Sequence, residues 1–514
     1  MHQGCPGSPD PDRTNAVLAD PAGLAWGLLV AGMETASEAM MRAYSECNGF
    51  DDPDAADAAR PAWARLARWM RDTGLPALTA KQDEARLAFY REGITFAVYG
   101  EGGGTERAIP FDIIPRIITA AEWAYLQRGL VQRVQALNLF LADIYGPQRI
   151  IRDKVVPAEG VLDNSQYRAG MKGVKVPRGV YGAICGIDLV RTGEQEFHVL
   201  EDNLRVPSGV SYMLENRRIL SWLAPDLFEH HRVAPIGNYP DLLDLTLREL
   251  APSHTDDPTV VVLTPGPFNS AYFEHAFLAQ SIGAELVEGQ DLFVDDGFLY
   301  MKTIRGPQRV DVIYRRIDDD FLDPRAFRAD SMLGVPGLFE AIRAGNVALA
   351  NAVGTGVADD KSVYPHVPAM IRYYLDEDAI LPNVPTYTLS DPKQCAHVLA
   401  NLAELVVKEA QGAGGYGMLI GPKASQKERE AFADRIRANP DKYIAQPTLA
   451  LSTCPTLVDE GVAPRHVDLR PYVLQGSSIR MVPGGLTRVA LVDGSLVVNS
   501  SQGGGTKDTW VLQD

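Results

Sequence analysis

A lysine that precedes a glycine-rich segment is the first feature of the sequence that could do chemistry. The run LVVKEAQGAGGYGM places Lys408 at the end of a β-type stretch, before glycines at positions 412, 414, 415 and 417. Glycines let backbone N–H groups approach phosphate oxygens closely, and a lysine supplies the countercharge. Because the lysine precedes the glycines, the spacing is not that of a P-loop. A hairpin connection would show the same pattern, so both interpretations stay open.

Acidic and amide side chains at neighbouring strand ends form a second candidate site. The segment GIDLVRTGEQEFHVLEDN carries Asp188, Glu201 and Asn203, and strand alternation places Glu201 and Asn203 on one face. Magnesium prefers oxygen ligands of this kind, often one or two carboxylates together with substrate phosphates. The alternative is structural: the EDN segment caps a turn, and Asp188 pairs with Arg191 or Arg205.

Three cations could serve an anionic substrate. Arg470 in HVDLRPYV and Arg488 in LTRVAL fall on successive expected strands, where guanidinium groups could bind a phosphate or carboxylate. Lys361 follows two acids in NAVGTGVADDK, at the expected start of a helix. Taken singly, each arginine is more typical of a surface ion pair, and a lone lysine is usually solvated.

Composition limits the class of protein. The 514 residues allow about three domains, and 46% hydrophobic with 22% charged residues is ordinary for a globular protein. The formal charge of −17 disfavours binding to nucleic acid or anionic lipid. The five cysteines are far apart and form no C-x-x-C pair, which favours a reducing, cytoplasmic location. The apolar stretch at 24–33 is too short to cross a membrane and is expected to be a core helix.

The pattern along the chain predicts a mixed α/β protein. A Pro- and Asp-rich tail over 1–20 precedes a mainly helical region over 21–155, with a long helix from Ile117 that stops at Gly146. The segments GVYGAICGIDLVR and EFHVLEDN read as paired strands, and TVVVL, AYFEHAFLAQSIG and AELVEG read as a βαβ unit. Later strands are expected at DLFVDDGFLYMKT, RVDVIYRR, 404–408, KYIAQPTL, HVDLRPYVL, LTRVALV and GSLVVNS, and helices at 368–375 and 425–439.

Several strings together resemble one known family, the circularly permuted ATP-grasp proteins similar to glutathionylspermidine synthase. These strings are VLEDNLRVPSGVSYMLENR, VIYRRIDDDFLDP, NAVGTGVADDK, GAGGYGM, YIAQPTLALST and VVNSSQGGGTKDTWVL. In ordinary ATP-grasp enzymes the metal-ligand acids follow the lysines, whereas here they come first. The resemblance implies a permuted metal-ligand part over 156–225, a Rossmann-like pre-ATP-grasp domain over 226–355, an N-lobe with the glycine-rich loop over 356–450, and a C-lobe over 451–514.

The resemblance also implies roles for individual residues. Asp188, Glu201 and Asn203 would hold Mg²⁺, and Lys361 and Lys408 would contact the phosphates of ATP. The loop with Gly412, Gly414, Gly415, Tyr416 and Gly417 would cover those phosphates, and Gln446 and Pro447 would line the adenine slot. Arg470, with Arg488 and Lys507, would stabilise an acyl-phosphate.

The implied activity is ATP-dependent ligation of a carboxylate to an amine. Proteins of this subgroup tend to be encoded beside an alpha-E protein, a transglutaminase-like protein and the Anbu peptidase, which suggests a peptide-modifying system with these partners. A non-catalytic ATP-binding scaffold is the alternative. A glycosyltransferase using Asp318–Asp320 ranks lower, because it leaves Lys408 and Glu201 without a role, and exposed turn acids explain those aspartates.

Overall fold

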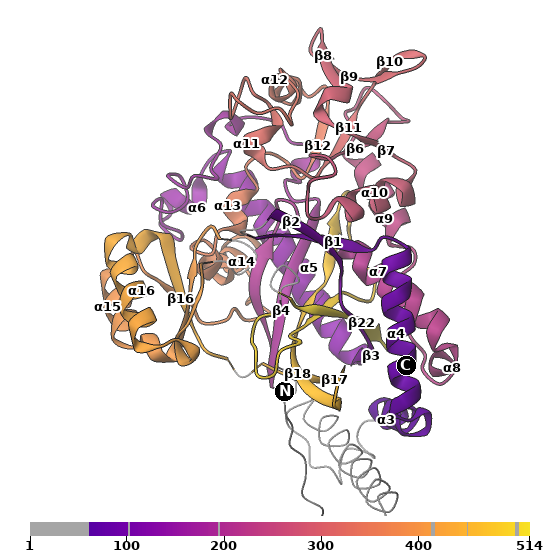
Figure 1. The fold of residues 1–514 in the computed structure, drawn as a ribbon. Helices are drawn as coiled ribbons and strands as arrows, with labels where there is room; N and C mark the ends of the chain where they lie inside the picture. The colour runs from indigo at the N-terminus through magenta and orange to yellow at the C-terminus, as the bar shows by residue number, and fades with distance from the viewer. Residues whose placement is uncertain are drawn as a thin grey trace, which may run out of the picture.

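A long mixed sheet occupies the middle of the protein, with two smaller α/β units beside it (Figure 1). The computed structural model describes residues 61–100, 103–193, 196–412, 417–449, 451–498 and 503–513. Within them, the central sheet has nine strands in the order β20-β19-β4-β18-β21-β22-β3, with β5 paired to β4 and β17 paired to β18. Their bounds are β3 Phe111–Ile118, β4 Ile184–Gly193, β5 Glu196–Asn203, β17 Thr453–Val458, β18 Gly461–Arg470, β19 Tyr472–Gln475, β20 Ile479–Arg480, β21 Leu486–Val489 and β22 Gly505–Val511.

Burial explains why β4 and β5 form where they do. Nine of the ten residues of β4 are buried, as expected for a strand covered on both faces, whereas β5 alternates between buried and more exposed positions. The two strands are antiparallel and pair Asp188 with Glu201 and Gly186 with Asn203. The predicted strand pair is therefore confirmed, and its register brings two of the candidate acids side by side.

The region before residue 155 is helical, but it also contributes strands. Its helices are α3 Pro61–Thr73, α4 Leu75–Arg91, α5 Ala120–Ile144 and α6 Arg149–Arg152. The long helix α5 confirms the prediction, and Thr119 and Glu122 cap its start with reciprocal hydrogen bonds. The sequence did not predict β1 Thr95–Gly100, β2 Gly103–Ala108 or β3, although β3 pairs in parallel with β22. The expected tail and the expected core helix at 24–33 lie outside the described residues.

We call residues 260–350 the Rossmann-like unit, because they contain a parallel sheet in the order β12-β11-β6-β7. The strands are β6 Val260–Leu263, β7 Glu285–Val287, β11 Val312–Arg315 and β12 Ala348–Ala350, and α10 Tyr272–Ile282 connects β6 to β7. This arrangement confirms the predicted βαβ unit. Strands β8 Leu292–Asp295, β9 Phe298–Thr303 and β10 Gly306–Arg309 form a separate antiparallel sheet, and α11 Asp319–Leu322 and α12 Leu338–Arg343 complete the unit.

The second small unit is an antiparallel sheet with two helices, and we call it the lysine lobe because it carries Lys408. Its strands are β13 Tyr387–Thr388, β14 Leu405–Glu409, β15 Leu419–Ile420 and β16 Tyr443–Pro447, and its helices are α15 Pro392–Ala400 and α16 Gln426–Ala438. Short helices α13 Gly356–Asp359 and α14 Val367–Leu375 lead into it. Ser425 caps α16 with Glu428, which confirms the predicted start of that helix.

The end of the chain differs from the prediction. Residues 494–498, part of the expected strand GSLVVNS, form no strand, and β22 follows them instead.

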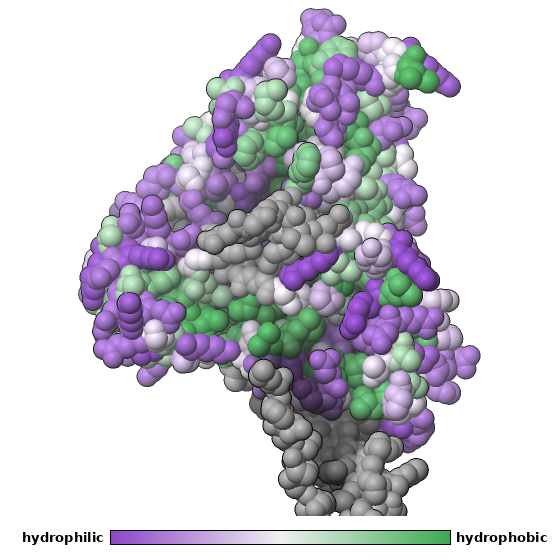
Figure 2. All heavy atoms as spheres, in the orientation of Figure 1, coloured by the Kyte–Doolittle hydropathy of each residue, from purple (hydrophilic) through white to green (hydrophobic). Residues whose placement is uncertain are grey.

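The remaining helices, α7 Val210–Leu223, α8 Pro225–Glu229 and α9 Tyr239–Glu249, run between β5 and the Rossmann-like unit. In the described part of the chain, no helix is long and apolar enough to cross a membrane. Hydrophilic and hydrophobic residues are interspersed on the face shown in Figure 2.

One asparagine connects the Rossmann-like unit to the central sheet. Asn351, directly after β12, is 1% exposed, and its Oδ1 accepts hydrogen bonds from the backbone N–H groups of Ala183 (2.7 Å) and Ile184 (2.8 Å). Its Nδ2 donates to the carbonyl oxygen of Ile184 at 2.7 Å. The buried side chain of Arg315 donates to the carbonyl oxygen of Asn351 at 2.7 Å, which holds this junction from the other side.

Asn351→Ala should lower the free energy of unfolding by about 3 kcal/mol or more, because it leaves two backbone N–H groups buried without an acceptor. Asn346→Ala is the matched control, since Asn346 makes a single exposed hydrogen bond to Gly297 and should cost less than about 1 kcal/mol. Urea unfolding of both variants measures the difference. Equal losses in the two variants would contradict this role of Asn351.

Candidate active site

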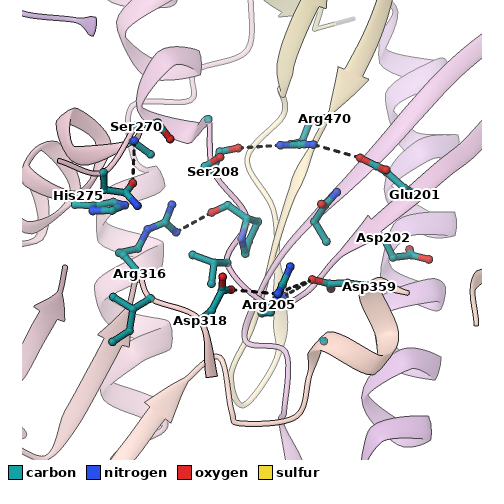
Figure 3. Close-up of a pocket in the computed structure, with 18 of the residues that line it drawn as sticks. Glu201, Asp202, Arg205, Ser208, Ser270, His275, Arg316, Asp318, Asp359 and Arg470 are labelled. Atoms are coloured by element: carbon teal, nitrogen blue, oxygen red, sulfur yellow. Dashed lines mark hydrogen bonds and ion pairs between the residues drawn. The ribbon is translucent and has the colours of Figure 1, made fainter. Parts of the chain in front are cut away.

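A polar cavity lies between the central sheet and the Rossmann-like unit. It has a volume of about 540 Å³ and is lined by residues from β5, the turn 205–209, the start of α10, the end of β11, the segment 356–361 and strands β18 and β21. Figure 3 shows Glu201 and Arg470 on one side of the cavity, and Arg316, Ser270 and His275 on the other. Six of the predicted site residues line it, namely Glu201, Asn203, Lys361, Gly412, Arg470 and Arg488.

Asp188 lies beneath this cavity and is shared by two arginines. It is fully buried on β4, and its Oδ2 accepts hydrogen bonds from Nη2 of Arg470 (2.7 Å) and Nη2 of Arg488 (2.6 Å). Burial would raise the pKa of Asp188, but the two guanidinium groups outweigh it and hold the pKa below its ordinary value. Arg488 also donates from Nε to both oxygens of Asp468 at 3.0 Å. The sequence analysis predicted Asp188, Arg470 and Arg488 as site residues, but it did not predict that they contact one another.

Glu201 and Lys361 form a charged pair at the cavity surface. Nζ of Lys361 lies 3.3 Å from Oε2 of Glu201 and donates to the carbonyl oxygen of Gly412 at 2.7 Å. Nη2 of Arg470 lies 3.8 Å from the other oxygen of Glu201. Asn203 follows two residues later on the same face of β5, and its Nδ2 is buried without a hydrogen-bond partner among the described residues. Its amide is therefore not fixed by neighbouring protein groups.

Lys408 lies near this group, although it does not line the cavity. Its Nζ donates to Oε1 of Gln446 at 2.8 Å, across the antiparallel pair of β14 and β16. Burial lowers the pKa of Lys408 to about 8, with Glu201 opposing this shift and Lys361 adding to it. Lys408 therefore lies close enough to Glu201 and Lys361 for their charges to affect its pKa. Gln446 is buried and also donates from Nε2 to Oγ1 of Thr386 at 3.0 Å, and Pro447 ends the same strand.

The glycine-rich segment is described only at its two ends. Gly412 lines the cavity, and Gly417 has φ of +69°, a conformation that favours glycine. Gly414, Gly415 and Tyr416 lie outside the described residues.

Lys507 is not brought to the cavity. It is fully buried on β22, and its Nζ contacts the carboxylate of Asp112 and donates to the carbonyl oxygens of Ile114 (3.1 Å) and Pro455 (2.8 Å). All three donors of its ammonium group are therefore used within the fold. We leave Lys507 out of the site proposed below, because its contacts are those of a structural lysine.

Several cavity residues were missed by the sequence analysis. Arg205 contacts Asp318 at 3.2 Å and Asp359 at 3.5 Å, and burial raises the pKa of Asp359 to about 7. Arg316 follows β11 directly, and an arginine at the carboxyl end of a parallel strand was a signal that could have identified it. The remaining lining residues include Ser208, Asn269, Ser270 and His275.

The expectation of exposed acids at 318–320 holds for only part of that segment. The side chains of Asp318 and Asp320 are 48% and 53% exposed, whereas Asp319 is buried and pairs with Arg315 at 2.6 Å. Asp319 therefore helps to hold the end of β11, which the composition of the segment did not indicate.

Comparison with known proteins identifies the class to which this fold and site belong. Residues 115–490 match the family described as circularly permuted ATP-grasp type 2, and the chain belongs to this family. An uncharacterized protein of Synechocystis is 56% identical over 475 residues, which cover 92% of this chain and 99% of the relative. The family resemblance read from the sequence is thus confirmed.

Two further matches are a related sequence and a solved structure that shares the fold. The Frankia alni protein named "Putative glutamate--cysteine ligase 2-3" is 43% identical over 509 residues, which cover 97% of this chain but only 59% of that relative. A glutathione synthetase-like effector from Globodera pallida shares the fold, with a TM-score of 0.54 and 10% identity over 85% of this chain and 98% of the effector.

The pKa of Lys408 predicts how stability depends on pH. The folded protein releases this proton near pH 8, whereas the unfolded chain keeps it up to the ordinary lysine value of 10.5. Because the unfolded state then binds more protons, stability should rise with pH between these two values. Wild type should gain stability over this interval relative to Lys408→Met, as measured by urea unfolding across the pH range. The exposed Lys393→Met on α15 should behave like wild type. A difference in the free energy of unfolding between wild type and Lys408→Met that stays constant across this pH range would contradict the lowered pKa.

Proposed function

We propose that the protein is an ATP-dependent carboxylate–amine ligase that forms an amide bond through an acyl-phosphate and releases ADP. The observation that carries this proposal is the convergence of Lys361, Glu201 and Asn203 with the pair Arg470 and Arg488 around one cavity, with Lys408 behind it, where Glu201 and Lys361 affect its pKa. These residues come from the central sheet, the lysine lobe and the segment between the Rossmann-like unit and the lysine lobe. Membership of the ATP-grasp family and the ligase name of the Frankia relative support the same reaction class.

The residues present fit a magnesium site. Glu201 and Asn203 offer a carboxylate and an amide at the cavity, and oxygen donors of this kind suit Mg²⁺, whereas both oxygens of Asp188 accept hydrogen bonds from arginines beneath it. The buried Nδ2 of Asn203 has no partner in the described residues, so the amide can turn its oxygen toward a ligand. The described residues hold no group of three or more His, Cys, Asp or Glu side chains that could bind a metal, and the proposed site accordingly includes the Asn203 amide and the nucleotide phosphates. Bound Mg²⁺ would neutralise charge on the phosphates.

The cationic side chains have distinct proposed tasks. Lys361 and Lys408 bind phosphate oxygens of ATP, while the segment from Gly412 to Gly417 covers them and Gln446 and Pro447 line the adenine slot. The substrate carboxylate oxygen attacks the γ-phosphorus, the bond to ADP breaks, and an acyl-phosphate forms. Arg470 and Arg488 stabilise its charge, because Asp188 holds both guanidinium groups in place before the reaction.

The second step needs no covalent enzyme intermediate. The amine nitrogen attacks the acyl carbon, the C–N bond forms, phosphate leaves with the electron pair of the C–O bond, and the nitrogen loses a proton. Catalysis then rests on positioning and charge neutralisation. Among the described cysteines, Cys185 and Cys454 are buried, and neither lines the cavity. Participation of alpha-E, transglutaminase-like and Anbu proteins stays a prediction.

Nucleotide binding tests the proposal directly. Calorimetric titration of Mg²⁺ with a non-hydrolysable ATP analogue should show binding to wild type that is weakened roughly 10- to 100-fold in Lys408→Met, since an ammonium–phosphate hydrogen bond is lost. Lys393→Met, an exposed lysine of the same lobe, should bind as wild type does. If wild type does not bind the analogue at all, the ligase proposal is wrong, and so is the alternative of an ATP-binding scaffold.

The metal assignment can be tested separately. Glu201→Gln combined with Asn203→Ala should weaken binding of the ATP analogue in the presence of Mg²⁺ much more than in EDTA, because only the first condition uses the oxygen ligands. Glu404→Gln combined with Asn401→Ala, next to β14, gives a matched pair outside the cavity and should change neither value. If the variant of Glu201 and Asn203 lost equal binding affinity with and without Mg²⁺, these two residues would not be metal ligands.

A further inference from the structure

The wall of the cavity formed by the Rossmann-like unit has no role in the site proposed above. Strand β6 pairs with β7 on one side and β11 on the other, so the strand order reverses at β6. In open parallel sheets, ligands bind in the crevice at the carboxyl ends of the strands where this reversal occurs. Pro265 lies two residues beyond β6, Arg316 directly follows β11, and both line the cavity. The sheet topology therefore marks this wall as a binding position.

Arg316 has an N–H group without an acceptor at this wall. The side chain is 3% exposed, and its Nη1 donates to the carbonyl oxygen of Pro207 (2.7 Å) and to the hydroxyl of Tyr314 (2.9 Å). Its Nη2 donates to Oε1 of Glu274 at 2.8 Å. Its Nε has no hydrogen-bond partner among the described residues. Buried donors are rarely left unpaired, and a guanidinium cannot lose its proton, so this donor is suited to an acceptor supplied by a ligand.

The start of α10 adds a second source of positive potential. Asn269, Ser270 and Ala271 precede this helix of eleven residues and line the cavity, and Figure 3 shows Ser270 on the same side of the cavity as Arg316. The first turn of an α-helix carries a partial positive charge that favours anions. His275 on the same helix contributes no charge, because burial and Arg316 lower its pKa to about 2. Arg316 and the helix start are thus the groups that would attract an anion here.

The carboxylates of this wall already have partners. Glu274 accepts hydrogen bonds from Arg316 through Oε1, and from Gly209 N (2.7 Å) and Ser211 N (3.1 Å) through Oε2. Asp318 pairs with Arg205 at 3.2 Å. Because Glu274 balances the charge of Arg316, the wall suits a singly charged carboxylate better than a doubly charged phosphate.

We propose that this wall is a binding site for a second carboxylate of the acid substrate. The inference rests on the proposed function: one carboxyl group of the substrate reacts near Glu201 and Arg470, and another is bound by Nε of Arg316 and the start of α10. The two positions lie on either side of a single turn, because Arg316 donates to the carbonyl oxygen of Pro207 (2.7 Å) and Arg470 to that of Ser208 (3.3 Å). The ligase would accordingly act on dicarboxylic acids, including amino-acid derivatives that keep a free carboxylate.

Calorimetric titrations into protein saturated with Mg²⁺ and the ATP analogue test this assignment. The probes are α,ω-dicarboxylates from malonate to pimelate, each compared with its own monomethyl ester. The best-bound dicarboxylate should bind about 10- to 100-fold more tightly than its ester, the effect of one charge-assisted hydrogen bond. Arg316→Lys keeps a positive charge beside Glu274 but has no Nε donor in that position, and it should lose most of this preference. Arg343→Lys, exposed at the end of α12, should keep it.

A second variant protects the test against misfolding of the first. Ser270→Glu leaves the pair of Arg316 and Glu274 intact, adds a carboxylate at the start of α10, and should also reduce the preference for the dicarboxylate. If no dicarboxylate binds more tightly than its ester while the nucleotide analogue binds, the second carboxylate site is wrong and the proposed function stands. A full preference retained in both Arg316→Lys and Ser270→Glu would likewise overturn it. Absence of nucleotide binding in wild type would overturn the proposed function itself.

Discussion

The rest of the structure depends on the charge of Asp188, which is buried in the middle of the central sheet. Removing a carboxylate from water costs several kcal/mol unless cationic partners compensate it. Arg470 on β18 and Arg488 on β21 supply those partners, and Asp468 in turn binds Arg488. Strands β4, β18 and β21 are adjacent, so the alternating charges fix their mutual register. Through its pairing with β4, this arrangement also determines where Glu201 and Asn203 of β5 lie.

The order of the elements along the chain determines how the two smaller units are connected to the central sheet. The central sheet combines β3, the pair β4 and β5, and the strands from 453 onward, so both smaller units are formed by the chain between β5 and β17. Bringing together the two ends of so long a chain segment costs little more entropy than it does for a short segment, because the entropic cost grows only with the logarithm of segment length. The lysine lobe and the Rossmann-like unit can therefore lie beside different parts of the central sheet while Lys361, in the segment between the two units, reaches Glu201. Contacts between distant residues do, however, slow folding.

Local pattern predicted those elements whose signal is contained in their own residues. Helix α5, the β6–α10–β7 unit and strands β4, β5, β14 and β16 have clear periodicity or capping residues, and all were expected. Strands β3 and β22 were missed because they pair with each other across nearly the whole chain, and GTKDTWV shows no apolar alternation that would mark it. The contrast between Arg470 and Lys507 makes the same point for the site. Each is a cation on a β-strand near the carboxyl end of the sequence, and only the fold shows that Lys507 binds Asp112.

The charge balance of the cavity explains why one lysine differs from the other cations. Arg470 and Arg488 share Asp188, Lys361 is paired with Glu201, Arg205 with Asp318, and Arg316 with Glu274. Among the described residues, Nζ of Lys408 donates to a neutral amide, that of Gln446, and burial lowers its pKa to about 8. A cation with a carboxylate partner has its charge balanced before any ligand binds. A phosphate beside Lys408 instead supplies the missing countercharge, raises the pKa of the ammonium group and removes the cost of its burial. Of these cations Lys408 is therefore the one without a carboxylate partner, which is why we expect a phosphate of ATP to bind beside it.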